Sequence, residues 1–196
     1  LVGSEMCIRD RCNASTGIGK SNIDWEGRLH QFKDLCETVR KKSNSQYNCV
    51  IPVSGGKDST WQVIKALEFD LKPLCVTWRS PARTPLGQRN LDNLIGLGVD
   101  HMDFSVNPVV EKEFLKKTFF LMGSPAIPMH MAIHAIPTNT ALNWGIPLII
   151  FGENAAFEYG GSSKLSSDWK LSSEWFKKFG VTNGTNASDW SDSYLT

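Results

Sequence analysis

The sequence predicts an α/β protein built around a doubly wound, mostly parallel sheet. Short runs of β-branched and other apolar residues alternate along the chain with longer segments whose apolar residues recur at helical spacing. One short run passes through a glycine turn directly into a helical segment, which is the order strand, turn, helix. Strands joined by helices pair in parallel, and their crossovers cover both faces of the sheet. We therefore expect one buried sheet between two layers of helices.

The first predicted helix spans 24–42, and the first strand spans 49–53. Asp24 can cap this helix because its carboxylate accepts a hydrogen bond from an unpaired N–H of the first turn. The apolar stripe of the helix consists of Trp25, Leu29, Phe32, Cys36 and Val39. The helix after the glycine turn is predicted at 59–69, with Trp61, Val63, Ile64 and Leu67 as its apolar residues.

The remaining elements continue the alternation as far as residue 151. Strands are predicted at 74–78, 101–104 and 147–151, and helices at 86–97, 109–121 and 129–144. Pro137 falls inside the last of these helices, so we expect that helix to be broken or kinked there. Beyond residue 161 the chain is rich in Ser, Asp and Asn but also carries aromatic residues, which favours helical pieces over a disordered tail.

The strongest candidate for a ligand-binding site is the turn Ser54-Gly55-Gly56-Lys57-Asp58-Ser59. Two glycines allow the backbone to approach a ligand closely, and the unpaired N–H groups of the following helix attract an anion such as phosphate. Lys57 adds a positive charge. The turn is not a Walker P-loop, because Asp58 stands where that motif has Ser or Thr. The alternative is that these ordinary turn residues form only a connector.

Two other motif candidates fail. The glycines at 17–21 match neither the Walker pattern, which would need glycine at Ala14, nor the dinucleotide fingerprint, which would need glycine at Asn22. His130 and His134 are four residues apart, as in some metal sites, but no third ligand stands nearby. Because zinc sites need three or four protein ligands, we interpret both as structural histidines and expect no zinc site.

The carboxyl ends of two further strands supply candidate residues along the same edge of the sheet, where open parallel sheets bind ligands. The main chain near Thr77 and Trp78 is a candidate contact for adenine, although these residues could equally just end a strand. Glu153 follows the strand at 147–151 and is a candidate for substrate orientation or proton handling. The alternative for Glu153 is an acid that only stabilises a helix N-terminus.

Composition limits the classes of function. The 21 basic and 20 acidic residues give a net charge of +1, which provides no broad positive field for a nucleic acid. No apolar stretch approaches the ~20 residues of a membrane span, and no secretory signal is recognisable, so we expect a cytoplasmic protein without membrane insertion. The five cysteines are scattered and odd in number, which disfavours disulfides.

The turn at 54–59 resembles the SGGxDS signature of the PP-loop ATP pyrophosphatases, whose fold is Rossmann-like. These enzymes cleave ATP between the α and β phosphates and activate a carbonyl oxygen as its adenylate. The flanking segments narrow the resemblance to the N-acetyl sugar amidotransferases of bacterial surface-polysaccharide (lipopolysaccharide) and flagellar-glycan synthesis. The segments that carry it are 24–29, 50–59, 74–77, Gly152-Glu153-Asn154 and Glu158-Tyr159-Gly160-Gly161.

The resemblance implies a reaction and a set of roles. Family members convert the acetamido group of a sugar, expected here to be nucleotide-linked, into an acetamidino group, with ammonia from glutamine-hydrolysing partner proteins. ATP and Mg²⁺ are the implied cofactors. The backbone at Gly55 and Gly56, with the hydroxyls of Ser54 and Ser59, would hold the departing pyrophosphate. Lys57 would neutralise it and Asp58 would help to hold Mg²⁺.

The chain also departs from the family. Family members carry Cys-x-x-Cys pairs, but Ser15, Ala126 and Met129 stand where partner cysteines would be, which fits a metal-free variant. Residues 1–11 resemble translated sequencing-adaptor sequence. We therefore expect an artefact at 1–11, an N-terminal segment at 12–48, a nucleotide-binding domain at 49–161 and the start of a truncated helical region at 162–196, all within a fragment of a longer protein.

Two alternative functions stay open. The first is another PP-loop enzyme, either one that thiolates tRNA or one that amidates a different acceptor with ATP. The near-neutral charge and the missing Cys-x-x-Cys pairs disfavour tRNA thiolation. The second is a non-catalytic nucleotide-binding fragment. The sequence leaves open which N-acetyl sugar is bound, which protein supplies ammonia and what the oligomeric state is.

Overall fold

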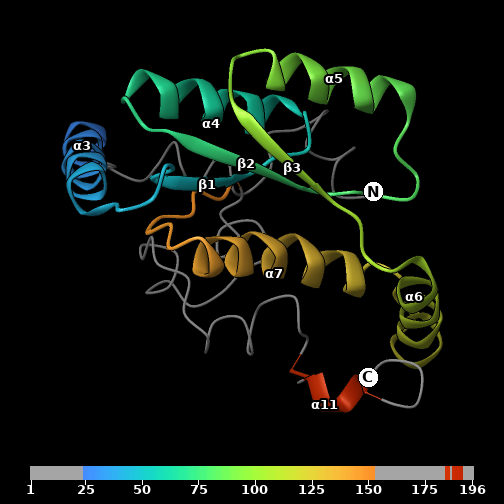
Figure 1. Cartoon of the computed structure of the whole chain (residues 1–196). Coiled ribbons are helices and arrows are strands. Elements are labelled where there is room, and N and C mark those ends of the chain that lie inside the picture. The colour runs from blue at the N-terminus through green and yellow to red at the C-terminus, as the bar shows by residue number, and fades with distance from the viewer. Residues whose placement is uncertain (1–23, 153–183, 186, 192–196) are drawn as a thin grey trace.

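The computed structural model describes residues 24–152, 184, 185 and 187–191, and it has a parallel sheet with helices on both faces (Figure 1). In chain order the elements are α3 (Trp25–Lys42), β1 (Cys49–Pro52), α4 (Lys57–Glu68), β2 (Pro73–Trp78), α5 (Pro85–Ile95), β3 (Asp100–Phe104), α6 (Pro108–Met122), α7 (Ile127–Asn143) and α11 (Ala187–Trp190). The predicted strands at 49–53, 74–78 and 101–104 and the predicted helices are confirmed, with ends within two residues of the prediction. The segment predicted as a strand at 147–151 forms only an isolated bridge, at Ile149.

The three strands pair in parallel in the order β1-β2-β3. A fourth segment extends the sheet beside β1, because Val50 forms a parallel bridge with Ile149 while also pairing with Leu74 of β2. Two backbone hydrogen bonds support this bridge, from Val50 N to Leu148 O at 2.9 Å and from Ile150 N to Val50 O at 3.0 Å. The sheet therefore changes direction at β1, which makes the carboxyl end of β1 a topological switch point.

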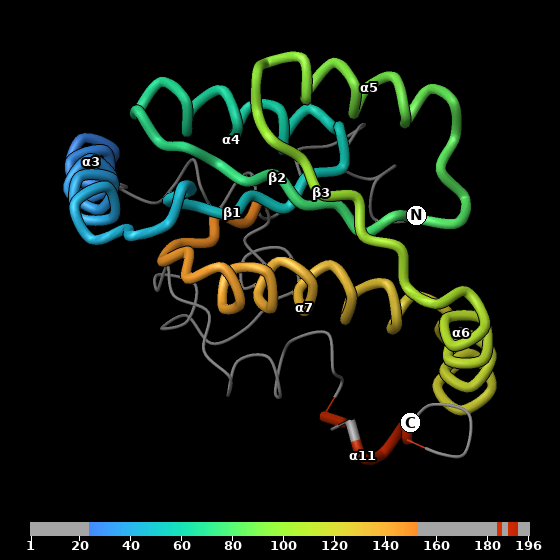
Figure 2. The backbone as a smooth tube through the Cα atoms, viewed as in Figure 1, coloured from blue at the N-terminus to red at the C-terminus, as the bar shows by residue number. Residues whose placement is uncertain are grey.

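Each face of the sheet has its own hydrophobic core. Alternate strand residues point to opposite faces, so Ile51 and Cys75 pack with α4 and α5, whereas Val50 and Val76 pack with α7. Figure 2 shows α4 and α5 on one side of the strands and α7 on the other, with α3 at the β1 end of the assembly. Helices on both faces confirm the doubly wound α/β class that the sequence predicts.

Helix α3 begins as predicted, whereas α4 begins earlier than predicted and packs on the sheet through a different face. Asp24 caps α3, with its Oδ1 accepting a 2.8 Å hydrogen bond from Gly27 N. Helix α4 starts at Lys57, and its buried residues are Ser59, Val63 and Ala66. Trp61, expected on the apolar face, is 61% exposed, because the helix is rotated to place the small residues against the strands. Ile64 is exposed for the same reason.

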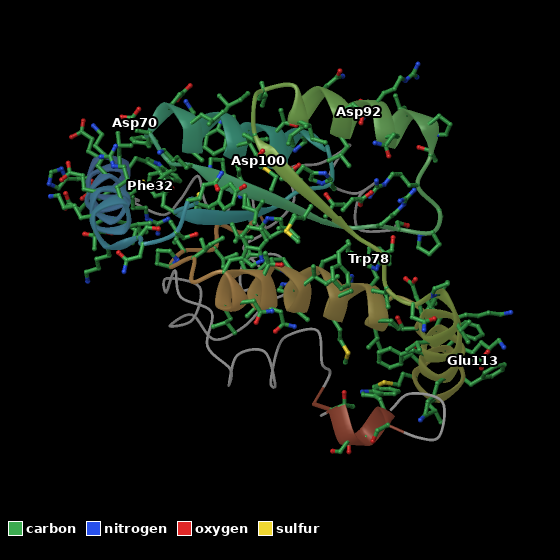
Figure 3. All side chains as sticks on the ribbon, viewed as in Figure 1. Phe32, Asp70, Trp78, Asp92, Asp100 and Glu113 are labelled. Atoms are coloured by element: carbon green, nitrogen blue, oxygen red, sulfur yellow. The ribbon has the colours of Figure 1, made fainter. Side chains whose placement is uncertain are left out.

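Helix α7 continues through Pro137, so of the predicted break or kink the break is wrong and the kink stays a prediction. A proline inside a helix removes one backbone hydrogen bond and costs roughly 3 kcal/mol. Pro137 is buried, and its neighbours Ile136 and Ala141 belong to the core beneath Val50 and Val76. Burial of this helix against the sheet offsets the local cost, and the indole of Trp78 also packs on this side (Figure 3).

Three cysteines, one on α3 and two in the sheet, behave as small apolar residues. Cys36, Cys49 and Cys75 are free and buried in the core on the α4 side. Burial raises the pKa of Cys49 and of Cys75 to about 12, so both stay protonated near neutral pH. These three thiols are therefore packing groups and not nucleophiles.

Several predictions concern residues that the structure does not describe or describes only in part. Residues 1–23 and 153–183 lie outside the described part of the chain, which includes the predicted boundaries at 11 and 161. The division of the chain at 11, 48 and 161 stays a prediction. Of the region beyond 161, Trp190 of α11 is buried, and its ring packs against Phe114 of α6 with 5.2 Å between centroids. Across the described residues, no helix combines the length and the apolar character that a membrane span requires.

Candidate active site

The glycine turn lies at the carboxyl end of β1, where the sheet changes direction. Gly56 is the N-cap of α4, and Lys57 and Asp58 form the first turn of that helix. Within the described part of the chain, the backbone N–H groups of Lys57 and Asp58 make no hydrogen bond. The turn therefore presents free donors and the positive end of a 12-residue helix at the ligand-binding edge of the sheet.

Gly55 is required by the fold itself. It is buried and has φ +79°, a conformation that side chains rarely adopt. A Cβ at this position would lie 2.6 Å from the backbone N of Leu91 and 2.9 Å from the carbonyl carbon of Asn90. The sequence suggests that both glycines serve ligand approach, but the close neighbour of Gly55 is helix α5.

Gly56 has no such constraint. Its φ is −73°, which any residue adopts, and a Cβ there would meet only Ser54 Oγ, at 3.4 Å. Because Gly56 is exposed at the start of α4, the space beside it is open on the side where the free N–H groups lie. Of the two glycines, Gly56 is the one whose missing side chain can serve a bound anion.

The two serines of the turn differ in what they can do. Ser59 is buried, its Oγ donates to Gly56 O at 3.1 Å, and it accepts from Ser54 N at 3.4 Å. This hydroxyl shapes the turn from inside. Ser54 is exposed, and its Oγ accepts from Gly56 N at 3.4 Å, so its own proton stays available for a ligand.

Lys57 and Asp58 pair with each other at the surface. Lys57 Nζ lies 2.8 Å from Asp58 Oδ1 and 3.0 Å from Oδ2, and the side chains are 89% and 72% exposed. Solvent screens such a pair, so it adds little to stability. A phosphate at the start of α4 can compete for Lys57, and the carboxylate of Asp58 is a suitable oxygen donor for Mg²⁺ bound to that phosphate.

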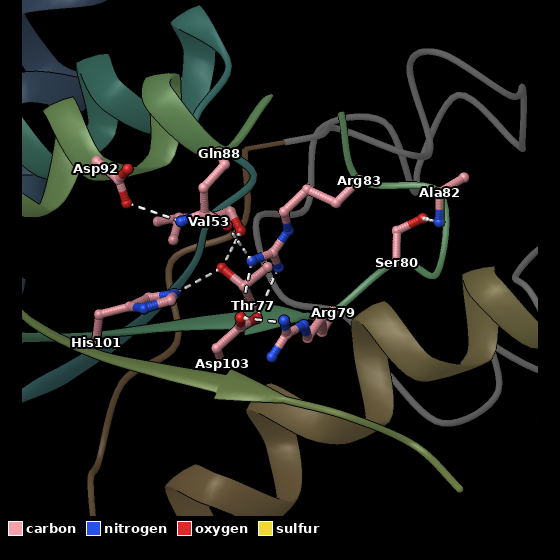
Figure 4. Close-up of polar contacts among 10 residues, drawn as sticks. All are labelled: Val53, Thr77, Arg79, Ser80, Ala82, Arg83, Gln88, Asp92, His101 and Asp103. Carbon is pink, nitrogen blue, oxygen red and sulfur yellow. Dashed lines mark hydrogen bonds and ion pairs between the residues drawn. The ribbon is translucent and has the colours of Figure 1, made fainter. Parts of the chain in front are cut away.

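Thr77 ties the end of β1 to β2 and β3 (Figure 4). Its buried Oγ1 donates to Val53 O at 2.7 Å and lies 2.9 Å from His101 Nε2. Because the single hydroxyl proton goes to Val53, the imidazole of His101 donates through Nε2, as the neutral ring with its proton on Nε2 can do. Burial lowers the pKa of His101, which agrees with this assignment. The side chain of Thr77 thus supports the glycine turn, and the predicted adenine contact of its main chain stays a prediction.

His101 gives the fold a pH dependence. Its pKa in the folded state lies below 6.5, so between that value and 6.5 the unfolded chain binds more protons than the folded one. We therefore expect the melting temperature to fall as the pH is lowered through this window. His101→Gln should flatten the profile, whereas His30→Gln, at an exposed position on α3, should leave it unchanged. If the melting temperature changes with pH by the same amount in wild type and in His101→Gln, the assignment is contradicted.

A second network joins the loop after β2 to β3. Arg83 makes two hydrogen bonds with Asp103, Nη1 to Oδ2 at 2.7 Å and Nη2 to Oδ1 at 2.6 Å, and its Nη1 also donates to Gln88 Oε1 at 3.0 Å. Figure 4 shows Arg83 between Gln88 and Asp103. The hydrogen bonds from Arg83 lower the pKa of Asp103. The sequence places the loop at 79–85 beyond a strand end, but the partner on β3 follows only from the register of the sheet.

The β2–β3 cleft, as we call it, opens beside this network and has a volume of about 470 Å³. It lies between the loops that follow β2 and β3 and the first turns of α5 and α6, and its lining includes Arg79, Arg83, Gln88 and Glu111. Glu111 is only 8% exposed, and burial raises the pKa of its carboxyl. No sequence signal marks Glu111, because an acid in the first turn of a helix ordinarily only complements the dipole.

The other predicted site residues are placed as follows. Glu153 lies outside the described residues, but Gly152 before it lies against α4, where its Cβ would be 3.0 Å from Gln62 Oε1. His134 Nδ1 lies 3.0 Å from His130 O, and its ring stacks on Phe151. Among the described residues, no three His, Cys, Asp or Glu side chains lie together in a way that could hold a metal ion.

Comparisons with known proteins identify a fold. No family model and no curated protein matches the chain. Among solved structures, the NMN synthetase from Francisella tularensis matches with a TM-score of 0.52 and 16% identity over 70% of this chain. The NH3-dependent NAD synthetase from Campylobacter jejuni, in complex with the nitrate ion, matches with a TM-score of 0.54 and 13% identity over 88% of this chain.

These likenesses confirm the predicted fold class and nothing finer. The match spans 58% of the NMN synthetase chain and 77% of the NAD synthetase chain. At such low identity the shared property is the Rossmann-like α/β fold alone. Neither of these two structures is an N-acetyl sugar amidotransferase.

Proposed function

We propose that the turn at 54–59 binds the phosphates of ATP and that this protein adenylates a carbonyl oxygen, which ammonia then replaces. The observation that carries the proposal is the start of α4 at the switch point of the sheet. Free N–H groups, Lys57 and Asp58 meet there beside the unobstructed Gly56. The match of the turn to SGGxDS and the likeness to an ammonia-dependent synthetase support the same chemistry.

The proposed acceptor is the acetamido group of an N-acetyl sugar, as the sequence resemblance implies. The amide oxygen attacks the α phosphorus of ATP, the bond from that phosphorus to the bridging oxygen breaks, and pyrophosphate leaves. Ammonia then attacks the amide carbon, the bond from carbon to the AMP oxygen breaks, and loss of a proton from nitrogen yields the amidine. Amide oxygen departs poorly from carbon, and its conversion into a phosphate ester supplies the leaving group.

The residues of the turn would act mainly through charge and position. The N–H groups at the start of α4 and the Ser54 hydroxyl would hold the departing pyrophosphate, and Lys57 would neutralise its charge. Ser59 would act indirectly by holding the shape of the turn from inside. When bound beside Asp58, Mg²⁺ would neutralise further charge on the phosphate oxygens.

Substrate delivery completes the proposal. Ammonia would come from a glutamine-hydrolysing partner protein, and the sugar would be nucleotide-linked, both as the resemblance implies. The reaction would take place in the cytoplasm, where ATP is available. Glu153 keeps its proposed role in substrate orientation or proton handling, since it directly follows Gly152 at the same edge of the sheet.

A second candidate is the ATP-dependent amidation of a carboxylate. The observation that favours it is that both reported structural neighbours are synthetases of nicotinamide nucleotides. Adenylation at the turn would be the same, and only the acceptor would differ. The near-neutral charge of the chain suits either small acceptor.

The test is to identify the products. The purified chain is incubated with ATP, Mg²⁺, ammonium chloride and either a panel of free and nucleotide-linked N-acetyl sugars or the carboxylate precursors of NMN and NAD. We expect AMP and pyrophosphate in equal amounts, together with a sugar in which NH has replaced O, detected by mass spectrometry. An amidated carboxylate would favour the second candidate. Formation of ADP and phosphate, or no pyrophosphate with any acceptor, would overturn adenylation.

A further inference from the structure

The β2–β3 cleft holds a buried carboxyl that the proposed chemistry does not use. Glu111 lies in the first turn of α6 and lines the cleft, yet it is only 8% exposed. Within the described residues no hydrogen bond or ion pair to its carboxylate is found, and its oxygens are not among the buried polar atoms that lack a partner. Burial of the residue raises the pKa of the carboxyl. The carboxylate oxygens therefore reach the space of the cleft and stay available to accept hydrogen bonds from a bound ligand.

The other charged groups of the cleft define which ligand fits. Arg83 is bound by Asp103 and Gln88, and so it has little capacity left for a ligand. Arg79 is 60% exposed, and its nearest carboxylate, Asp103, is 3.8 Å away, so its guanidinium keeps free donors. One free donor group and one free acceptor group leave the cleft with no net charge, which disfavours a phosphate.

The remaining lining is a mixture of hydroxyls and apolar rings. Ser80 and Ser105 contribute hydroxyl groups, while Pro81, Pro85 and Pro108 contribute apolar surface. A sugar ring has the matching chemistry, because hydroxyl groups that both donate and accept surround apolar C–H faces. The volume of about 470 Å³ lies within the range of small-molecule sites.

We propose that the β2–β3 cleft binds the ring of the acceptor sugar, with Glu111 accepting hydrogen bonds from ring hydroxyls and Arg79 donating to them. The choice of the acceptor sugar rests on the proposed function. The cleft opens at the same edge of the sheet as the glycine turn, and β1 and β3 are separated by β2 alone. At a strand spacing of ~4.8 Å, β1 and β3 themselves are roughly 10 Å apart.

Contacts through α5 support this arrangement. Gly55 packs against α5 at Asn90 and Leu91, less than one helical turn beyond Gln88, which lines the cleft. A ring held by Glu111 and Arg79 would therefore lie beside the turn that holds ATP. Its acetamido group could then extend toward the α phosphate while the ring stays in the cleft.

The experiment measures binding and leaves turnover out. Free N-acetylglucosamine, N-acetylgalactosamine and N-acetylmannosamine are titrated calorimetrically into the full chain, and Mg²⁺-ATP is titrated separately. We expect at least one sugar to bind, and Glu111→Gln and Arg79→Met each to weaken it by about tenfold or more, the effect of losing a hydrogen bond to a charged group. Glu113→Gln, on the same helix and paired with Lys116 outside the cleft, should bind like wild type.

The outcomes separate this inference from the proposed function. Sugar binding that is lost in both cleft variants, with ATP binding unchanged, supports it even if no pyrophosphate is ever released. If the two cleft variants bind ATP more weakly than wild type but bind 2′,3′-dideoxy-ATP as wild type does, the cleft holds the ribose of ATP. That result would overturn the acceptor assignment. No sugar binding to wild type, or equal binding by wild type, Glu111→Gln and Arg79→Met with unchanged melting temperatures, would also overturn it.

Discussion

Replacing Lys57 with Ala is expected to abolish pyrophosphate formation while the protein stays folded, and Asp58→Ala is expected to do the same. Removing one preorganised group that stabilises charge in the transition state costs about 10²–10³-fold in rate. Both side chains are largely exposed, and their mutual ion pair is screened by water, so stability should change by less than about 1 kcal/mol. Pyrophosphate release and thermal melting, measured on the same samples, check the two halves of this prediction.

A matched control separates the site from general effects of charge. Lys112→Ala removes an exposed lysine from α6, away from the turn, and should leave turnover unchanged. Lys57→Arg should retain part of the activity, because it keeps the positive charge in a different shape. Wild-type turnover in both Lys57→Ala and Asp58→Ala would remove these residues from the catalytic site.

The second prediction separates the two glycines of the turn. Gly55→Ala should destabilise the protein by roughly 2–5 kcal/mol, because a side chain at φ +79° is strained and its Cβ would overlap the backbone of α5. For a chain of this size, that corresponds to a melting temperature lower by about 10 °C. Loss of activity in Gly55→Ala would then follow from loss of the fold.

Gly56→Ala should show the opposite pattern. Its φ of −73° suits alanine, and its Cβ would contact only Ser54 Oγ, so the fold should keep nearly all of its stability. The added methyl group would occupy the space beside the free N–H groups, so we expect ATP binding to weaken by about tenfold or more. Calorimetric titration with Mg²⁺-ATP measures this effect. Unchanged ATP affinity in a folded Gly56→Ala protein would mean that phosphate does not approach there.

Most of the fold could be predicted because its signals are local. Asp24 was identified as a cap from residue type alone, and it caps α3. Strand ends at Trp78 and Phe104 were predicted to the residue. The failures came where packing outweighs local preference: Pro137 stays helical because α7 is buried against the sheet, and Trp61 is exposed because α4 turns its small residues inward.

The candidate site divides in the same way. The turn could be found from the sequence because its residues are consecutive and lie between a strand and a helix. The pairing of Arg83 with Asp103, which are 20 residues apart, could not be found, because it depends on how β2 and β3 align. Glu111 carried no signal either, since its burial depends on where α6 lies against the loops that follow β2 and β3.

By itself, the sequence determined the alternation of strands and helices, the position of the glycine turn and the placement of Lys57 and Asp58 near a helix start. These properties depend on neighbouring residues and on periodicity along one segment. Only the tertiary structure decided that Gly55 serves α5 while Gly56 faces open space, and that Glu111 and Arg79 share a cleft. Such properties arise when segments distant in the chain come into contact, and packing and strand register set those contacts.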